Sequence, residues 1–369
     1  RQQERIAAPP AEYHYRYNAA GLAPGRVKLE FRLPGVPGAA LIHTIAIAAR
    51  QPGNEVYLGR NGNLRIDGKP FFIRGFMGAH RNFDDMKHAA CNTVHFYTLN
   101  RAEIPEIRAR LDECRRQGMH AVFSPFHKTS VGFWGVNHSG KKTPSLKFSD
   151  AEVARMRAMV NAVKDHPALL GWYLYDEPRG SEWTAELRRM YTLLCELDPA
   201  HPVFGCDNGA DGCIGKRDAC DITVLDLYLN PILNGPPKRP PSMILAAVER
   251  IARNLGPGKM LVYAPQAFDV DSFMPAGTVR KSRPPTYEEC AAAVFGALAA
   301  GARGILAYKI GNPDVVGNPA QRHPNAGVYA DPELKKAFLE IIMPKLQEQE
   351  SFFLTPGEAA PSRGGVRRL

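Results

Sequence analysis

The chain has 369 residues, 44% of them hydrophobic and 23% charged, and a formal net charge of +10. This length fits one large domain with an appendage, or two ordinary domains. No run of about 18 uncharged apolar residues occurs, which excludes an obvious membrane-spanning helix. The basic residues are spread along the chain without interleaved aromatic residues, so we predict an ordinary basic surface and no nucleic-acid or membrane partner.

Residues 1–60 differ in pattern from the rest and predict a small N-terminal β appendage. The segment 26–33 (RVKLEFRL) alternates apolar and charged residues, which is typical of a half-buried strand, and 41–49 is a second strand candidate. Within 63–72, Asp67 and Gly68 separate two short runs, which predicts a hairpin with a type I′ turn.

From residue 71 onward, short apolar runs alternate with helical patterns, which indicates βα units and a parallel sheet. Four helices are predicted at 104–118, 149–166, 241–256 and 286–301, and the second and fourth begin with capping-box spacing. The apolar runs number eight: 71–77, 93–99, 120–126, 169–178, 202–208, 222–229, 260–268 and 304–312.

Eight strands with interleaved helices predict an α/β fold, a (β/α)8 TIM barrel over residues 61–350, followed by a C-terminal tail at 351–369. A doubly wound open sheet is the alternative fold. That fold usually carries a glycine-rich phosphate loop after its first strand, and the segment RGFMGAHRN does not match one.

Polar residues concentrate where the predicted strands end. Chemistry in such barrels lies at the C-terminal ends of the strands, because the interior is packed with side chains and an unpaired charge inside costs several kcal/mol. At the open mouth of the barrel these polar side chains can be hydrated or can converge on a ligand. They are His80, Tyr97, His127, Asp176, Glu177, Asp207, Asn208, Asp226, Tyr228, Gln266 and Lys309.

The fourth apolar run ends in two adjacent carboxylates, in the segment HPALLGWYLYDEP. Strand alternation predicts Tyr173, Tyr175 and Glu177 on one side, with Pro178 ending the strand. Glu177 would then emerge at the barrel mouth beside an aromatic surface. Such surroundings keep a carboxyl group protonated, as a general acid requires. A strand-end glutamate paired with Arg179 is the alternative interpretation.

Four segments together resemble clan-A glycoside hydrolases, the retaining (β/α)8 enzymes with cellulase-like and β-galactosidase-like members. The segments are NLRIDGKPFFIRGF, AACNTVHFY, HPALLGWYLYDEP and GARGILAYKIG, and the resemblance covers residues 61–345. It implies that Glu177 is the proton donor, that Asp176 helps to hold substrate hydroxyls, and that Tyr228 supports the second carboxylate.

One position departs from the clan's pattern. Gln266, in MLVYAPQAF, occupies the place where the clan has its nucleophilic glutamate, and an amide cannot act as that nucleophile. Asp226 is our preferred second carboxylate, with Asp207 as the alternative. Activation of a water by either would give inversion. A barrel that binds sugar without cleaving it is the alternative from another class.

Histidines from three successive strands, His80, His95 and His127, raise the hypothesis of a metal-dependent hydrolase. The His-x-His pair usual in such barrels is missing after the first strand, so we predict no metal and no cofactor. We expect His80, Tyr97 and His127 to contact sugar hydroxyls and His95 to be internal. Trp134, in a glycine-rich loop, could stack on a sugar ring or pin that loop.

Lys309 follows the eighth strand, and Arg280, Lys281 and Arg283 lie in the long irregular loop 268–286, a type of loop that often forms a functional lid. Together these cations suggest an acidic saccharide. The interpretation that we carry forward is a glycoside hydrolase that cleaves a poly- or oligosaccharide in a secreted or periplasmic setting. Oligomeric state is not predicted.

The cysteine count leaves the redox setting open. The chain has seven cysteines, so at least one cannot pair within the chain, and one or two disulfides are possible. No CxxC pair indicates a zinc site. The N-terminal segment RQQERIAAPP lacks the apolar core of a signal peptide, but a mature secreted protein lacks one too.

Overall fold

A computed structural model gives the fold, and the chain separates into two compact units, residues 1–49 and 50–369. In the first unit, β1 (Gly25–Arg32) pairs antiparallel with β2 (Ala40–Ile47), which confirms both predicted strands. The structure describes residues 25–32, 40–47, 53, 55–59, 62–78, 82–97, 99, 102–126, 147–178, 183–256, 258–275, 277–311 and 327–354.

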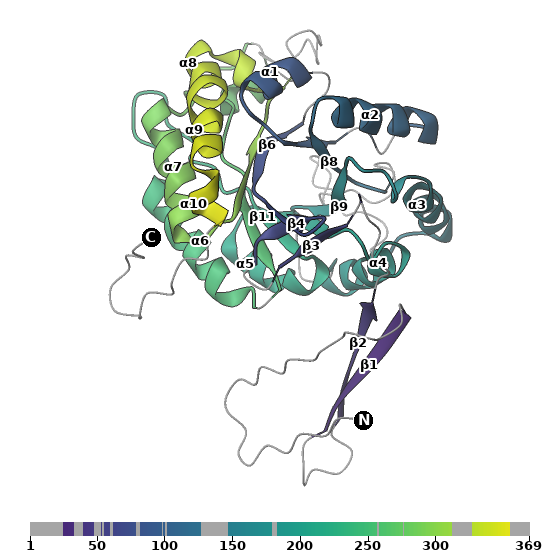
Figure 1. Cartoon of the computed structure of the whole chain (residues 1–369). Coiled ribbons are helices and arrows are strands. Elements are labelled where there is room, and N and C mark those ends of the chain that lie inside the picture. The colour runs from purple at the N-terminus through teal and green to yellow at the C-terminus, as the bar shows by residue number, and fades with distance from the viewer. Residues whose placement is uncertain are drawn as a thin grey trace. The chain divides into compact units, whose positions relative to one another are not determined.

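The second unit contains a closed barrel of eight parallel strands, which confirms the predicted (β/α)8 fold (Figure 1). Each predicted apolar run supplies one barrel strand. The strands are β6 (Ile73–Met77), β7 (Thr93–Phe96), β8 (His120–Phe123), β9 (Leu169–Asp176), β10 (Val203–Asp207), β11 (Ile222–Leu225), β12 (Met260–Tyr263) and β13 (Gly304–Tyr308).

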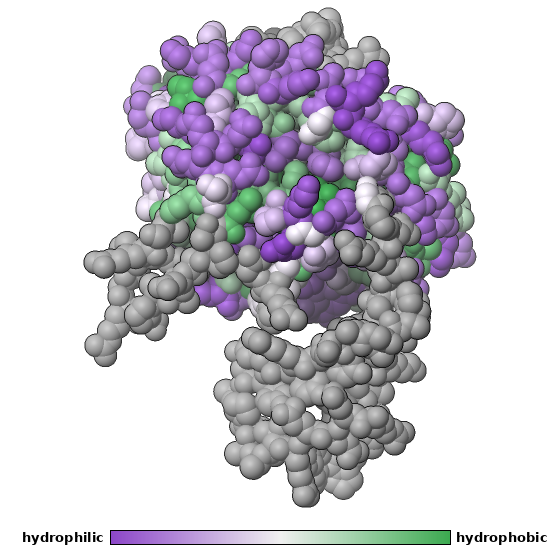
Figure 2. Space-filling view, viewed as in Figure 1, coloured by the Kyte–Doolittle hydropathy of each residue, from purple (hydrophilic) through white to green (hydrophobic). Residues whose placement is uncertain are grey.

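Helices surround the strands, and their outward surface in Figure 2 is largely hydrophilic. The capping boxes predicted at Ser149 and Thr286 are both formed, with Glu152 and Glu289 as their partners. The helices are α1 (Phe83–His88), α2 (Ile104–Arg116), α3 (Asp150–Val163), α4 (Thr184–Leu197), α5 (Ala210–Gly215), α6 (Pro241–Asn254), α7 (Tyr287–Ala300), α8 (Pro332–Lys335), α9 (Met343–Glu348) and α10 (Glu350–Leu354), with a π-helical turn at Lys336–Ile342.

Strand alternation divides the apolar side chains into two buried clusters. The outer cluster packs between strands and helices. The inner cluster fills the barrel and includes Ile73, Met77, Val122, Leu170, Tyr173, Phe204, Cys206, Ile222, Val224, Met260, Val262 and Leu306. Because the interior is filled, polar chemistry is left to the strand ends.

A three-stranded antiparallel sheet, β3 (Val56–Leu58), β4 (Leu64–Ile66) and β5 (Lys69–Phe71), precedes the first barrel strand. The turn between β4 and β5 has positive φ at Asp67 (49°) and Gly68 (82°), which confirms the predicted type I′ hairpin. Val56 and Leu64 belong to the inner cluster, so this sheet closes the N-terminal end of the barrel. None of the helices that the structure describes is long and apolar enough to cross a bilayer.

Candidate active site

Three acidic side chains meet at the C-terminal end of the barrel. Asp176 is the last residue of β9, Glu177 follows it, and Asp226 follows β11. Asp176 and Asp226 are each only 5% exposed, while Glu177 is half-buried. One side-chain atom from each of Asp176, Asp226 and Cys206 lies within 4.8 Å of the others. The structure thus brings Asp176, Glu177 and Asp226 together as predicted.

Asp226 and Glu177 are neighbours at this end of the barrel, close enough for the charge of Glu177 to act on Asp226. Burial, and next the charge of Glu177, raise the pKa of Asp226 well above its usual range, although a hydrogen bond from Tyr228 lowers it. The raised pKa favours the protonated form of Asp226.

Each member of the pair is fixed by a neighbour. The Tyr228 hydroxyl donates to Oδ2 of Asp226 at 3.1 Å, in line with the supporting role implied by the resemblance. The Asn208 amide donates to Oε2 of Glu177 at 2.9 Å, and the Glu177 backbone N–H donates to the Cys206 carbonyl at 2.9 Å. Glu177 has φ of +46°, an uncommon conformation for a residue with a side chain.

The predicted alternation in the fourth barrel strand is wrong beyond Tyr173. The pairing of β9 with β10 skips a residue, so that Phe204 faces Tyr173 while Gly205 faces Tyr175. This bulge turns Tyr175 outward, where its hydroxyl lies 3.4 Å from the Cys220 sulfur, and leaves Tyr173 in the inner cluster. Asp176 consequently reaches the cluster with Cys206 and Asp226.

Aromatic rings line the same end of the barrel. Tyr97 after β7 and Tyr228 after β11 each lie 6.0 Å from the ring of Tyr308 on β13, and Phe268 lies 5.0 Å from Tyr228. The three tyrosines are half-buried, so part of each ring faces solvent. After burial, the charge of Asp176 is the largest cause of a raised pKa at Tyr97, which places this predicted contact residue beside the acids.

His95 lies beneath Tyr97 in the barrel and is 1% exposed, so it is internal as predicted. Its ring packs 4.4 Å from the Tyr97 ring and 4.2 Å from the Tyr173 ring. Burial lowers its pKa to about 3, and neither ring nitrogen has a hydrogen-bond partner among the described residues. A neutral imidazole therefore supports the two tyrosines from below.

Lys309 directly follows β13 and is 8% exposed. Its ammonium group lies 5.0 Å from the centre of the Phe273 ring, and its Cβ is next to the Cα hydrogens of Gly78, where an added Cβ would approach to 3.3 Å. Burial lowers the pKa of Lys309 to about 8. A partly desolvated cation thus stands at the same end of the barrel as the acids.

Asp207 does not join the acidic cluster. Phe204 and Cys206 point into the barrel, so alternation turns Asp207 outward, toward α5. There Oδ2 accepts from the Lys216 ammonium at 2.7 Å, and both side chains are buried. Burial raises the pKa of Asp207, with Lys216 opposing the shift. A structural ion pair accounts for Asp207, and its predicted substrate contact has no geometric support.

Gln266 follows β12, the barrel strand that comes after Asp226 in the chain. Both ends of its side-chain amide are hydrogen-bonded to backbone groups. Oε1 accepts from the Asn230 N–H at 2.8 Å, and Nε2 donates to the Phe268 carbonyl at 2.9 Å. The side chain is 1% exposed. Gln266 therefore ties the loop after β11 to the loop after β12, and substrate contact stays a prediction for it.

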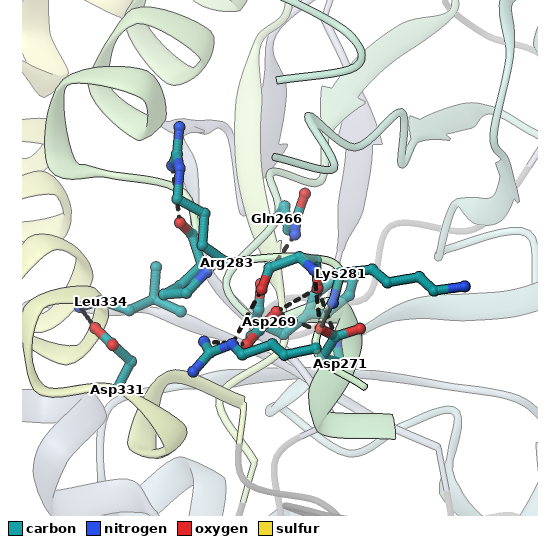
Figure 3. Close-up of polar contacts among 11 residues, drawn as sticks. Gln266, Asp269, Asp271, Lys281, Arg283, Asp331 and Leu334 are labelled. Carbon is teal, nitrogen blue, oxygen red and sulfur yellow. Dashed lines mark hydrogen bonds and ion pairs between the residues drawn. The ribbon is translucent and has the colours of Figure 1, made fainter. Parts of the chain in front are cut away.

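The loops after β11 and β12 are joined by further polar contacts. Asp271 accepts from the backbone N–H groups of Lys281 and Ser282, and Asp269 pairs with Arg280 at 2.8 Å (Figure 3). The Leu233 N–H donates to the Lys281 carbonyl, which links the two loops. The segment predicted as a lid is thus tied into a fixed wall beside Phe268 and Phe273.

Three of the predicted site residues lie outside the described part of the chain. His80, His127 and Trp134 are outside the described residues, so their contacts stay predictions. A different set from the histidines considered in the sequence, namely Asp176, Cys206 and Asp226, has the spacing to hold a metal ion.

All seven cysteines are free, so the possible disulfides are not formed.

Sequence reasoning missed Asn208 as the partner of Glu177 and Cys206 as a member of the acidic cluster. Asn208 was among the polar strand-end residues but had no assigned role, and its place one residue beyond β10 was the available indication. The cysteine gave no such indication, because a thiol in an apolar strand is normally core.

Comparisons with known proteins find a similar fold in solved structures of glycoside hydrolases. No protein-family model matches the sequence, and no curated protein matches it. Among solved structures, a chain titled "Glycoside hydrolase" is 15% identical with a TM-score of 0.55, covering 80% of this chain and 74% of that chain. A GH2 β-galacturonidase from Eisenbergiella tayi is 14% identical with a TM-score of 0.53, covering 82% and 55%.

A β-D-glucuronidase from Dictyoglomus thermophilum also matches, at 14% identity and a TM-score of 0.48, covering 86% of this chain and 57% of that chain. The chain thus spans little more than half the length of several of these structures. At such identities the likeness shows a shared (β/α)8 barrel fold. The chemistry has to be argued from the site itself.

Proposed function

We propose that the protein is a glycoside hydrolase that cleaves a poly- or oligosaccharide with Glu177 and Asp226 as its two catalytic carboxyl groups. The observation that carries the proposal is the proximity of these two groups at the mouth of a closed barrel, where burial and the charge of Glu177 raise the pKa of Asp226. Glycoside hydrolysis needs one carboxyl group in the acid form and one ionised, and two neighbouring carboxyl groups that disfavour double ionisation suit this requirement.

In the proposed reaction, Glu177 gives its proton to the glycosidic oxygen as the bond from that oxygen to the anomeric carbon breaks. Asp226, as carboxylate, either attacks the anomeric carbon or takes a proton from the attacking water. In the free site the raised pKa of Asp226 favours the proton on that residue, so the proposed reaction requires this proton to pass to Glu177 when substrate binds. Glu177 is half-buried at the rim and can meet the glycosidic oxygen, whereas Asp226 is buried and held by Tyr228. Asp176 adds negative charge that favours the oxocarbenium-like transition state.

The separation of the two carboxyl groups in a complex with substrate decides between retention and inversion. It is about 5–5.5 Å in retaining enzymes and about 6.5–9.5 Å in inverting enzymes. Because Asp226 is buried and held by Tyr228, we expect the position of Glu177 to set this separation when a sugar ring binds.

The test is hydrolysis of a glycan panel and of aryl glycosides by the wild type, Glu177→Gln and Asp226→Asn. We expect Glu177→Gln to lose activity on glycans, by about 10²–10⁴-fold, but to keep much of it on aryl glycosides whose leaving groups need no proton. Asp226→Asn should lose activity on both substrate types, because the second carboxyl acts on the anomeric carbon whatever the leaving group.

Asp218→Asn is a matched control, because this half-exposed carboxylate pairs with Arg188 on the barrel exterior. It should leave all rates within twofold. Unchanged turnover in both Glu177→Gln and Asp226→Asn would refute the assignment. The opposite pattern, with aryl glycosides spared by Asp226→Asn, would exchange the two roles.

The second candidate function is a carbohydrate-binding barrel without catalysis. Gln266 favours it, because this amide stands where clan-A enzymes carry their nucleophile and is fully used in backbone hydrogen bonds. Glycan binding with no turnover of any aryl glycoside would select this function. The alternative of a metal-dependent hydrolase would be supported instead if a chelator removed activity.

The printed names of two structures with TM-scores above 0.5 describe galacturonidases, one of them bound to galacturonate. They make a uronic-acid glycoside a sensible first member of the panel. The expected secreted or periplasmic location is part of the proposal, and cell fractionation tests it. The seven free cysteines provide no disulfide in its support.

A further inference from the structure

Three neighbouring barrel strands bring together side chains that metal ions favour. Asp176 ends β9, Cys206 lies opposite it in β10, and Asp226 follows β11. One donor atom from each lies within 4.8 Å of the others, and no other group of His, Cys, Asp and Glu among the described residues has this spacing. Cys206 is fully buried and both aspartates are 5% exposed, so the group is shielded from bulk water.

Two buried oxygen atoms at this group have no hydrogen-bond partner among the described residues. They are Oδ1 of Asp226, whose Oδ2 accepts from Tyr228, and the hydroxyl oxygen of Tyr173 in the inner cluster. After burial, the charges of Asp176 and Cys206 are the largest causes that raise the pKa of Tyr173, so its hydroxyl lies beside the group. Buried oxygens in native proteins are nearly always bonded, and these two therefore indicate a bound ligand.

The donor atoms determine which kind of ion fits. Zinc binds both thiolate and carboxylate, whereas magnesium and calcium take oxygen ligands. Zinc lies about 2.3 Å from sulfur and about 2.0–2.2 Å from oxygen, so the three side chains need to close only modestly around one ion. Each carboxylate has several acceptor positions, so it can bind an ion and keep a hydrogen bond. The thiol releases its proton to solvent when its sulfur binds the ion.

We propose that Asp176, Cys206 and Asp226 bind one divalent cation of the zinc type, and that this ion inhibits the protein from within its own active site. The ion site stands without the proposed function, whereas the inhibition rests on that function. There Asp226 acts on the anomeric carbon, and a carboxylate bound to a cation can neither attack carbon nor take a proton. The ion also cancels the negative charge that Asp176 offers to the transition state.

The first measurement is zinc binding to the full chain by calorimetry, which needs no turnover. Cobalt serves as a second probe, because a thiolate bound to cobalt gives a charge-transfer absorption. The variants are Cys206→Ala, Asp176→Asn and the control Cys114→Ala, which removes an equally buried thiol from the outer cluster. Asp176→Asn repeats the test without altering the packing around Cys206.

We expect the wild type and Cys114→Ala to bind zinc equally, and magnesium at least 100-fold more weakly than zinc. Cys206→Ala should bind zinc about 10- to 100-fold more weakly and lose the thiolate absorption with cobalt. Asp176→Asn should keep that absorption and bind zinc about tenfold more weakly.

The second measurement is the hydrolysis rate of each protein with and without zinc. Saturating zinc should lower the rate of the wild type and Cys114→Ala at least tenfold, and a chelator should restore it. Cys206→Ala, compared with its own metal-free rate, should need at least tenfold more zinc for the same inhibition.

The ion site would be overturned by no zinc binding in the wild type, by equal zinc binding in Cys206→Ala, or by a thiolate absorption that survives in that variant. Zinc that binds through Cys206 but leaves or raises the hydrolysis rate would overturn the inhibition. Failure of the proposed function is distinguishable from both. Zinc binding that depends on Cys206, in a protein that hydrolyses no glycoside, supports the ion site and removes the hydrolase.

Discussion

Replacing Lys309 by methionine should stabilise the protein. Burial lowers the pKa of Lys309 from 10.5 to about 8. At about 1.4 kcal/mol per pKa unit, the buried ammonium costs on the order of 3 kcal/mol of folding free energy at neutral pH. Methionine has a similar length and no charge, so the variant avoids this cost. It also loses the cation–π contact with Phe273, worth about 1 kcal/mol, so the gain is smaller than that cost.

The gain should depend on pH in a defined direction. Below pH 8 the lysine is protonated in both the folded and the unfolded state, and the full cost is present. Between about pH 8 and pH 10.5 the unfolded chain binds a proton that the folded protein does not, so the wild type becomes more stable relative to the variant as pH rises. The advantage of Lys309→Met should therefore be constant at pH 6–7 and shrink steadily above pH 8.

Urea unfolding of both proteins at pH 6, 7, 8, 9 and 10 measures this difference, and comparing the two proteins cancels groups that titrate in both. Lys281→Met serves as the control and should change stability by less than about 0.5 kcal/mol at each pH, because its side chain is exposed. A Lys309→Met protein that is less stable than the wild type at pH 7, or a difference that does not vary between pH 7 and pH 10, would refute the reasoning.

Three further outcomes are expected. Lys216→Met should destabilise the protein by about 3–5 kcal/mol in urea unfolding, because it strands the buried Asp207 carboxylate; adding Asp207→Asn should restore most of that loss, and a purely additive double variant would contradict the buried pair. Asn208→Ala should lower kcat about tenfold with little change in KM, since it frees the Glu177 carboxyl, and a change confined to KM would count against a positioning role. Iodoacetamide at pH 8 should label the folded protein slowly and all seven cysteines after denaturation; fewer than seven labels would reveal a disulfide.

The fold followed from local rules that the chain satisfies throughout. The eight apolar runs, the capping boxes at Ser149 and Thr286 and the Asp67–Gly68 turn each specify an element from a few neighbouring residues. The regular alternation of strands and helices then leaves few topologies. Among them, the closed barrel is the one in which every strand has a hydrogen-bonded neighbour on both sides. Prediction succeeded because local preference and global fold agree.

The site was only partly predictable, because its details depend on register. Counting inward and outward positions from Phe204 would have turned Asp207 away from the mouth. The same counting fails in β9, where a bulge sends Tyr175 outward and Asp176 inward. A bulge is a property of how two strands pair, and neither strand's sequence contains it alone. The proximity of Glu177 and Asp226 likewise arises from loops far apart in sequence.

The small sheet that carries Val56 and Leu64 has a consequence for any polymer that the protein handles. Since apolar side chains plug the barrel from that sheet up to the layer of His95 and Tyr173, a polymer has no passage along the axis. If the protein acts on a long glycan as proposed, that glycan would have to bind across the rim of the barrel, with one unit inserted toward the acids. Chain length beyond the few units that touch the rim should then matter little to affinity.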